Sequence, residues 1–253
     1  MDVFLAIRFD GGAVTEFFFN DVILRGVRNT LEVTILAMLL GTVLGVILAV
    51  MRVSHSRPLA GFSAFYVWFI RGTPVLIQLL VVYNGLPQMV GSDAFTHFLT
   101  PFRSALITFS LNEAAYMAEI VRAGIQAIEP GQMDAAKSLG MTNLQAMRRV
   151  ILPQALRVVI PPAGNEFIAM LKNTSVAFVI AFVELTTAAR LIYAVNFKVM
   201  ELLVVASIWY LIMTTAFSVL QAEMEARLTI VERERAIPLT TRVLRALGGG
   251  RER

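Results

Sequence analysis

Charged residues make up only 16% of this chain, and a few of them lie with amide side chains inside long apolar stretches. Polar groups in such surroundings are costly and usually functional. Glu166 and Asn173 are seven residues apart, so a continuous helix places them on one face. There the carboxylate could hold an ammonium group and the amide a second polar group. Lys172 lies about 100° around the same helix from Asn173, where it could meet a carboxylate or pair with Glu166 or Glu119.

Arg71, Thr73 and Gln78 are further candidates for contacts to a ligand. They lie where Gly72 and Pro74 interrupt a second apolar stretch, and broken helices offer free backbone groups to a ligand. For Arg71, the simpler role is to cap backbone carbonyls at this break. For all six candidates the alternative is structural, because polar groups inside a bundle can also satisfy one another.

Catalytic and metal chemistry find little support in the sequence. The chain has no cysteine, and His55 and His97 are far apart, so neither a disulfide nor metal-ligand spacing is present. No Gly is followed by Lys, so the phosphate-binding pattern Gly-x-x-x-x-Gly-Lys-[Ser/Thr] is missing. We therefore expect no catalytic residue, metal or cofactor on this chain, and any ATP chemistry belongs to another chain.

The elements that must position these residues are membrane helices. Of the 253 residues, 57% are hydrophobic and 16% charged, whereas a soluble domain has roughly 45–50% and 25%. A soluble core cannot hide so much apolar surface. This composition excludes a cytosolic enzyme, a disordered chain and a secreted disulfide scaffold. The net charge of +4 fits basic loops facing anionic lipid and does not indicate nucleic acid binding.

A spanning helix needs about 20 mostly apolar residues, and we count five such stretches. They are Thr30–Met51, Leu59–Leu86, Arg103–Ile128, Val158–Leu185 and Glu201–Gln221. Two are discontinuous. The second stretch breaks at residues 71–74; the fourth is loosened at its start by Pro161, Pro162 and Gly164 and breaks again at residues 173–175. In the first, Gly41 and Gly45 form a small-residue face that permits close helix packing. The fold class is all-α integral membrane.

The basic residues indicate how the chain is oriented. Five crossings place the termini on opposite sides, and 14 of the 22 Lys and Arg residues fall on the side of the C-terminus against six on the other. The positive-inside rule then puts the N-terminus outside and the C-terminus in the cytoplasm. We expect an extracytoplasmic segment at residues 1–21 without a cleaved signal peptide, a membrane domain at 22–222 and a cytoplasmic tail at 223–253. The start of the tail should extend the last helix, and its end should be disordered.

The cytoplasmic loop at residues 129–153 is too long for a tight turn and reads as two short helices. Pro130 opens the first and Gly140 closes it. Thr142 and Gln145 form a capping box for the second, and Pro153 ends it. The resulting helix–Gly–helix elbow exposes the small residues Ala135 and Ala136, which suits docking into a groove on a partner.

This loop resembles the EAA loop of the permease subunits of ABC importers, which reads Glu-Ala-Ala, three residues, Gly, nine residues, Ile-x-Leu-Pro. Here the corresponding residues are Asp134-Ala135-Ala136, Gly140 and Val150-Ile151-Leu152-Pro153. Further segments are similar to the polar amino acid permeases, and the similarity covers roughly residues 22–222. These segments are Arg71-Gly72-Thr73-Pro74 with Gln78, Tyr83-Asn84-Gly85-Leu86-Pro87, Ala118-Glu119-Ile120-Val121-Arg122-Ala123-Gly124, Leu152-Pro153-Gln154-Ala155, Asn165-Glu166-Phe167 and Lys172-Asn173-Thr174-Ser175.

The resemblance implies the membrane-spanning subunit of a type I ABC importer in the plasma (inner) membrane, and not an enzyme. Two permease subunits, identical or different, would pair, and an extracytoplasmic binding protein would deliver a polar amino acid. ATP and Mg would be held by ATPase subunits that contact the loop. The expected contact residues are Asp134, Ala135, Ala136, Lys137 and Gly140.

An ion-coupled secondary amino acid transporter is the alternative, because it too uses broken helices and midplane charges. It has no need for a helical elbow in the cytoplasm. Within the candidate site, the combination of one acid, Glu166, with the amide of Asn173 disfavours a strictly cationic substrate.

Overall fold

The structure is a computed structural model that describes residues 9–228. Its described part is helical, and its predicted all-α class is confirmed. The elements are α1 (Gly11–Phe18), α2 (Asp21–Val53), α3 (Arg57–Arg71), α4 (Val75–Leu80), the π-helix η2 (Val81–Gly85), α5 (Leu86–Val90), α6 (Asp93–Phe98), α7 (Pro101–Gln126), α8 (Pro130–Ser138), α9 (Asn143–Ala146), the π-helix η3 (Met147–Ile151), α10 (Leu152–Asn173), the 3-10 helix η4 (Thr174–Ile180), α11 (Leu185–Asn196) and α12 (Val199–Leu228).

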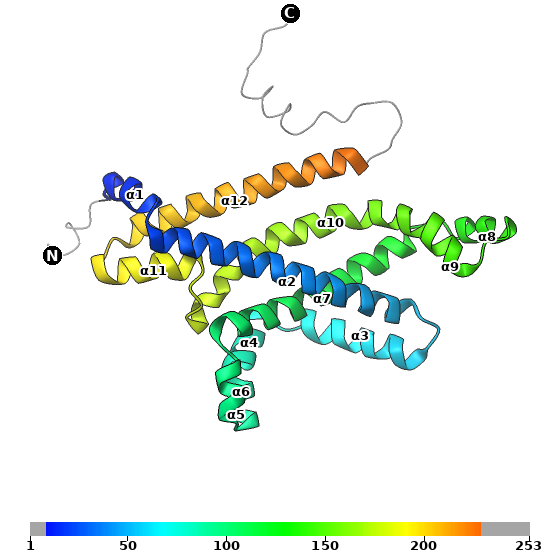
Figure 1. The fold of residues 1–253 in the computed structure, drawn as a ribbon, viewed down its shortest axis with the longest axis horizontal. Coiled ribbons are helices and arrows are strands. Elements are labelled where there is room, and N and C mark those ends of the chain that lie inside the picture. Colours follow the sequence, from blue (N-terminus) through cyan, green and yellow to red (C-terminus); the bar gives the residue numbers. More distant parts are fainter. Residues whose placement is uncertain (1–8, 229–253) are drawn as a thin grey trace, which may run out of the picture.

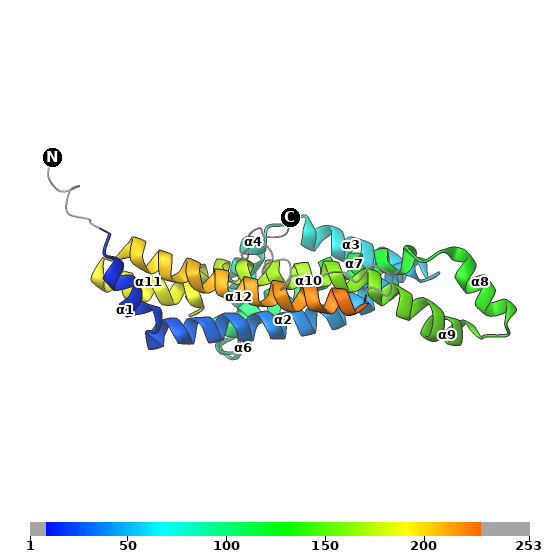
Figure 2. The ribbon, with the colours of Figure 1, turned by 90° about the horizontal axis from the view of Figure 1, so that it is seen from above.

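The long helices lie side by side along one axis and form an elongated bundle (Figures 1 and 2). At one end of this bundle lie α1 and α11, and at the other end lie α8 and α9. The segment from α4 to α6 leaves the bundle steeply near its middle (Figure 1). The described chain therefore enters the bundle at the α1 end, and α12 runs back toward the end that carries α8 and α9.

Two described helices are long and apolar enough to cross a membrane on their own, α2 and the stretch Val199–Ala226 of α12. Two bent pairs raise the number to four if each is one span. Arg57–Arg71 and Val75–Val90 meet at 99°, and Asn143–Ile180 and Leu185–Asn196 meet at 47°. The third predicted span, Arg103–Ile128, corresponds to α7, which is continuous but does not meet this criterion, because acidic and amide side chains lower its hydropathy.

The predicted break in the second span is confirmed. For the fourth span, the predicted change at residues 173–175 is seen as the end of α10 at Asn173, whereas the predicted loosening at the two prolines is wrong. Helix α10 runs without interruption through Pro161 and Pro162, as bundled helices allow when neighbours compensate for the changed backbone. Gln221 of α12 donates to the Pro161 carbonyl oxygen (3.1 Å), which ties α10 to α12 at this point. At Thr174 the helix tightens into η4, and the chain turns only at Ala181, whose φ is +55°.

Pro153 does not end the second helix of the loop, contrary to the prediction. It lies in the first turn of α10, directly after the π-helical turn η3, so that α9, η3 and α10 form one continuous rod. A proline ring clashes with the carbonyl four residues earlier in a regular α-helix. The wider π-helical turn places that carbonyl differently, which lets the helix continue.

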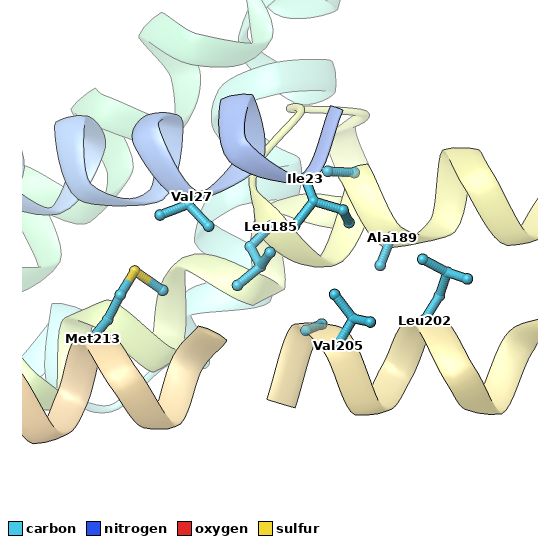
Figure 3. Packing of buried hydrophobic residues seen from close by; sticks show 9 residues of the cluster. Ile23, Val27, Leu185, Ala189, Leu202, Val205 and Met213 are labelled. Atoms are coloured by element: carbon cyan, nitrogen blue, oxygen red, sulfur yellow. The ribbon is translucent and has the colours of Figure 1, made fainter. Parts of the chain in front are cut away.

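The bundle is held by small clusters of buried apolar side chains. One joins α2, α11 and α12 (Figure 3), and it includes Ile23, Leu185 and Leu202, which are fully buried. The N-terminal helix is tied to the same region, because the indole Nε1 of Trp209 donates to the Phe18 carbonyl (2.9 Å) and the two rings stack at 4.9 Å. The last helix continues to Leu228, which confirms the predicted extension of α12 into the start of the tail. The predicted disorder at the end of the tail lies outside the described residues.

The predicted close packing at Gly41 and Gly45 is confirmed, and the partner is α7. A Cβ built on Gly41 lies 2.6 Å from the Glu113 Cβ, and one built on Gly45 lies 2.5 Å from the Met117 Cβ. Real Cβ atoms do not approach so closely, so α2 and α7 would have to separate to admit even a methyl group.

The substitution Gly41→Ala should therefore destabilise the bundle. Overpacking of this kind costs about 1–3 kcal/mol, and for a chain of this size each kcal/mol lowers Tm by roughly 2–4 °C. The measurement is the thermal unfolding of the purified protein in detergent. Gly61→Ala is the matched control, because nothing lies within 4 Å of a Cβ built on this glycine of α3. An equal Tm for the two variants would contradict the packing argument.

Candidate functional site

A cavity of about 560 Å³ opens beside the break between α3 and α4. Its walls come from that break, from α7 and from α10. This volume is in the range of small-molecule sites. The lining residues are Arg71, Gly72, Thr73, Pro74, Val75, Phe109, Asn112, Glu113, Tyr116, Glu166, Ala169, Met170 and Asn173.

The break between α3 and α4 forms the first wall. Helix α3 ends at Arg71, and Pro74 is the N-cap of α4. The Arg71 guanidinium carbon lies 4.9 Å from the centroid of the Tyr116 ring of α7, a cation–π arrangement that holds its charge at the cavity. Gln78 fills the capping role considered for Arg71, because its Nε2 donates to the Ile70 carbonyl (2.7 Å) and the Thr73 carbonyl (3.1 Å).

Gln78 lies behind this wall and is not among the lining residues. Its Nε2 also donates to Thr73 Oγ1 (2.8 Å), and its Oε1 accepts from Asn112 Nδ2 of α7 (3.1 Å). The amide thus connects the broken span to α7 and orients two side chains that do line the cavity. Of the candidates at the break, Arg71 and Thr73 reach the cavity directly, and Gln78 supports them.

Helix α10 contributes Glu166 and Asn173, which both line the cavity, as their spacing predicted. Lys172 does not join them. It lines a separate cavity of about 380 Å³ between α10 and α12, together with Ser175, Ser207, Tyr210, Leu211 and Thr214. The predicted pairing of Lys172 with Glu119 is not formed, because Glu119 pairs with Arg122 of its own helix at 2.6 Å.

Helix α7 contributes a second acid, Glu113, that was not expected at this site. Its side chain is 2% exposed and packs against Gly41 of α2. Within the described residues its Oε1 is buried without a hydrogen-bond partner, and its carboxyl lies within Coulombic range of Glu166. The premise that Glu166 is the single acid of the site is therefore wrong. Two features of the sequence could have indicated this position. Asn112 and Glu113 are neighbouring polar residues within one predicted span, and the small-residue face at Gly41 and Gly45 lets another helix pack closely.

The elbow at the end of the bundle has the local geometry that the sequence predicted. Gly140 has a φ of +81°, and the amide of Met141 donates to the Ala136 carbonyl (3.1 Å), which ends α8 in a glycine C-cap. The Thr142 amide donates to Gln145 Oε1 (2.9 Å), and the Gln145 amide donates to Thr142 Oγ1 (3.3 Å), which completes the capping box.

The surface of the elbow differs from the prediction in one respect. Ala135 is exposed, but Ala136 is 3% exposed and belongs to the inner side, where α8 packs against α9 and η3. Asp134, Lys137 and Gly140 are exposed as expected. Two apolar side chains of the elbow are also highly exposed, Leu139 at 80% and Leu144 at 67%. The sequence prediction did not include them.

Known proteins with similar sequences and structures carry consistent names. Residues 41–230 match the family described as binding-protein-dependent transport system inner membrane component. The arginine transport system permease protein ArgU of Corynebacterium glutamicum is 42% identical over 240 residues, which cover 92% of this chain and 75% of that protein. The L-cystine transport system permease protein TcyB of Bacillus subtilis is 41% identical over 204 residues, covering 80% and 85%.

Solved structures agree with these relatives. A chain in the crystal structure of an amino acid ABC transporter with histidines aligns with a TM-score of 0.78 and 39% identity, covering 88% of this chain and 99% of that one. A chain of the MetNI methionine ABC transporter, in inward-facing conformations, aligns with a TM-score of 0.66 at 20% identity, covering 82% and 96%, and shares the fold. The chain described here belongs to the family of binding-protein-dependent transport system inner membrane components, as a permease subunit of the amino acid ABC importer type.

Proposed function

We propose that this chain forms the translocation pathway of an ATP-driven importer for a polar amino acid. The observation that carries the proposal is the combination, on one bundle, of a charged cavity beside broken helices and a separate helix–Gly–helix elbow at one end. In this proposal the chain crosses the membrane five times. The crossings are α2, the bent pair from α3 to α5, α7, α10 with η4, and α12.

The elbow is the proposed docking site for an ATPase subunit, which would hold ATP and Mg. The exposed residues Asp134, Ala135, Lys137 and Gly140 form its surface with Leu139. The C-terminus and the elbow then lie in the cytoplasm. The opposite end of the bundle, with α1 and α11, faces outside (Figure 2), where an extracytoplasmic binding protein would deliver the substrate.

A second permease subunit is the proposed partner within the membrane. Many large apolar side chains of the bundle are exposed, including Leu39, Val43 and Ile47 of α2. Apolar surface of this extent needs lipid or another membrane chain around it. A paired subunit would close the open side of the cavity and leave the remaining surface to lipid.

The cavity offers opposite charges for the two ends of an amino acid. The Arg71 guanidinium suits the α-carboxylate, and the Glu166 carboxylate suits the α-ammonium. Asn173 supplies an amide for a further polar contact. Arg71 and Glu166 line the same cavity, so an amino acid bound between them would have a partner for its carboxylate and another for its ammonium group.

The energy source tests the proposal against an ion-coupled secondary transporter. We expect uptake of amino acid by the assembled transporter in proteoliposomes to stop when ATP is withheld while proton and sodium gradients are maintained. Addition of Mg·ATP should restore uptake. A non-hydrolysable ATP analogue is the control and should not restore it. Uptake that persists with ion gradients alone would contradict the proposal and indicate an ion-coupled secondary transporter.

A further inference from the structure

The buried carboxyl of Glu113 takes no part in the proposed contacts to the α-carboxylate and α-ammonium groups of the substrate. It lines the cavity, is 2% exposed, and its Oε1 lacks a hydrogen-bond partner among the described residues. A buried polar atom without a partner is costly, by about 1–3 kcal/mol and by more when the group is charged. Natural structures retain such groups where a ligand or another absent partner completes them.

The position of Glu113 is also fixed by the backbone. Gly41 of α2 approaches so closely that a Cβ there would lie 2.6 Å from the Glu113 Cβ and 2.8 Å from its Cγ. The stem of the side chain is therefore packed against the α2 backbone. Glu113 nevertheless belongs to the lining of the cavity, together with Glu166.

The ionisable groups that line the cavity are one base, Arg71, and two acids, Glu113 and Glu166. Their formal net charge is −1 when both acids are ionised. The nearby Glu119 does not change this sum, because it pairs with Arg122. If the main-chain ends of an amino acid meet Arg71 and Glu166, the carboxylate of Glu113 is the charge that stays without a partner.

We propose that Glu113 receives the side chain of the substrate and selects amino acids whose side chain is cationic. This inference rests on the proposed function and specifies the substrate class of the same cavity. A guanidinium or ammonium group would pair with the buried carboxylate and cancel the excess charge of the site. A neutral side chain leaves the Glu113 carboxyl without a charge partner, so this carboxyl takes up a proton and contributes no ion pair to binding.

Direct binding to the transporter tests the proposal, because the delivery protein has a selectivity of its own. The assembled permease–ATPase complex in detergent, without the binding protein, is titrated with radiolabelled arginine and with radiolabelled glutamine. We expect the wild type to prefer arginine. Glu113→Gln should reduce the ratio of arginine to glutamine affinity by about 30-fold, or ~2 kcal/mol, the range for loss of one buried charge partner.

Two further variants make the result interpretable. Glu113→Asp keeps the charge and should retain a preference for arginine. Glu32→Gln removes an exposed acid of α2 outside the cavity and should keep the wild-type ratio. Each variant is first shown to co-purify with the ATPase and to elute as a single species, so a failure to fold is recognised separately.

The outcomes are distinguishable from failure of the proposed function. A wild type that binds glutamine as tightly as arginine, or a Glu113→Gln variant with the wild-type ratio, overturns the role of Glu113 while ATP-driven amino acid import still stands. Absence of amino acid uptake by the wild-type transporter in proteoliposomes overturns the proposed function, and this inference with it.

Discussion

Replacing Leu139 by glutamate should abolish the association of this permease with its ATPase subunit and reduce amino acid uptake to background. Leu139 is the most exposed apolar side chain of the elbow, at 80%, and it directly precedes Gly140, where the chain turns with a φ of +81°. An exposed apolar side chain at such a turn can be buried in a groove on a partner, which favours association. A carboxylate at this point would have to be desolvated in the partner's groove, at a cost of several kcal/mol. The measurement is co-purification of the ATPase with a tagged permease.

Val195→Glu is the matched control for this prediction. Val195 is also 80% exposed, but it belongs to α11, at the other end of the bundle from α8 and α9 (Figure 1). The same charge introduced there should leave the ATPase bound. If Leu139→Glu retains the ATPase in wild-type amounts, or if both variants lose it equally, the elbow is not the docking site.

The second large effect is expected from Glu166→Ala, which should reduce uptake about 100-fold while the transporter still assembles. Glu166 is the α10 acid that lines the cavity together with Arg71 and Glu113. Removal of one partner of a desolvated charge pair typically costs 2–5 kcal/mol, of which about 2.7 corresponds to a 100-fold loss. Initial rates of uptake of labelled amino acid into proteoliposomes measure the effect, and co-purification of the ATPase reports assembly.

ATP hydrolysis by the same preparations separates a binding defect from a defective complex. Glu166→Ala should hydrolyse ATP at a measurable rate that vanadate inhibits, because the elbow is untouched. Glu32→Ala, on the exposed surface of α2, should transport like the wild type. Unaltered uptake kinetics in Glu166→Ala would show that this carboxylate does not bind the substrate.

The features that could be predicted from the sequence are those that depend on neighbouring residues. The glycine cap at Gly140 and the capping box of Thr142 and Gln145 are local hydrogen-bond patterns, and both form as expected. The common face of Glu166 and Asn173 follows from helical periodicity within α10. The break at Arg71 to Pro74 follows from the backbone limits of proline and glycine.

The features that could not be predicted depend on packing between distant segments. Glu113 belongs to the cavity because Gly41, far away in sequence, brings α2 against α7. Ala135 and Ala136 are chemically identical, and only the packing of α8 against η3 decides which of them is exposed. Pro153 is a strong local signal for a helix end, yet the π-helical turn before it lets the helix continue.

That continuity has a mechanical consequence. Because α9, η3 and α10 follow one another without a loop, the distance from Asn143 to Glu166 is spanned by a single stiff lever of roughly 35 Å, at about 1.5 Å per residue. Its far end is the turn at Ala181, where the chain bends by 47° toward α11, and this turn can serve as the fulcrum. If an ATPase subunit docks on the elbow as proposed, movement of the elbow would be transmitted along this helix to Glu166 and Asn173 at the cavity wall.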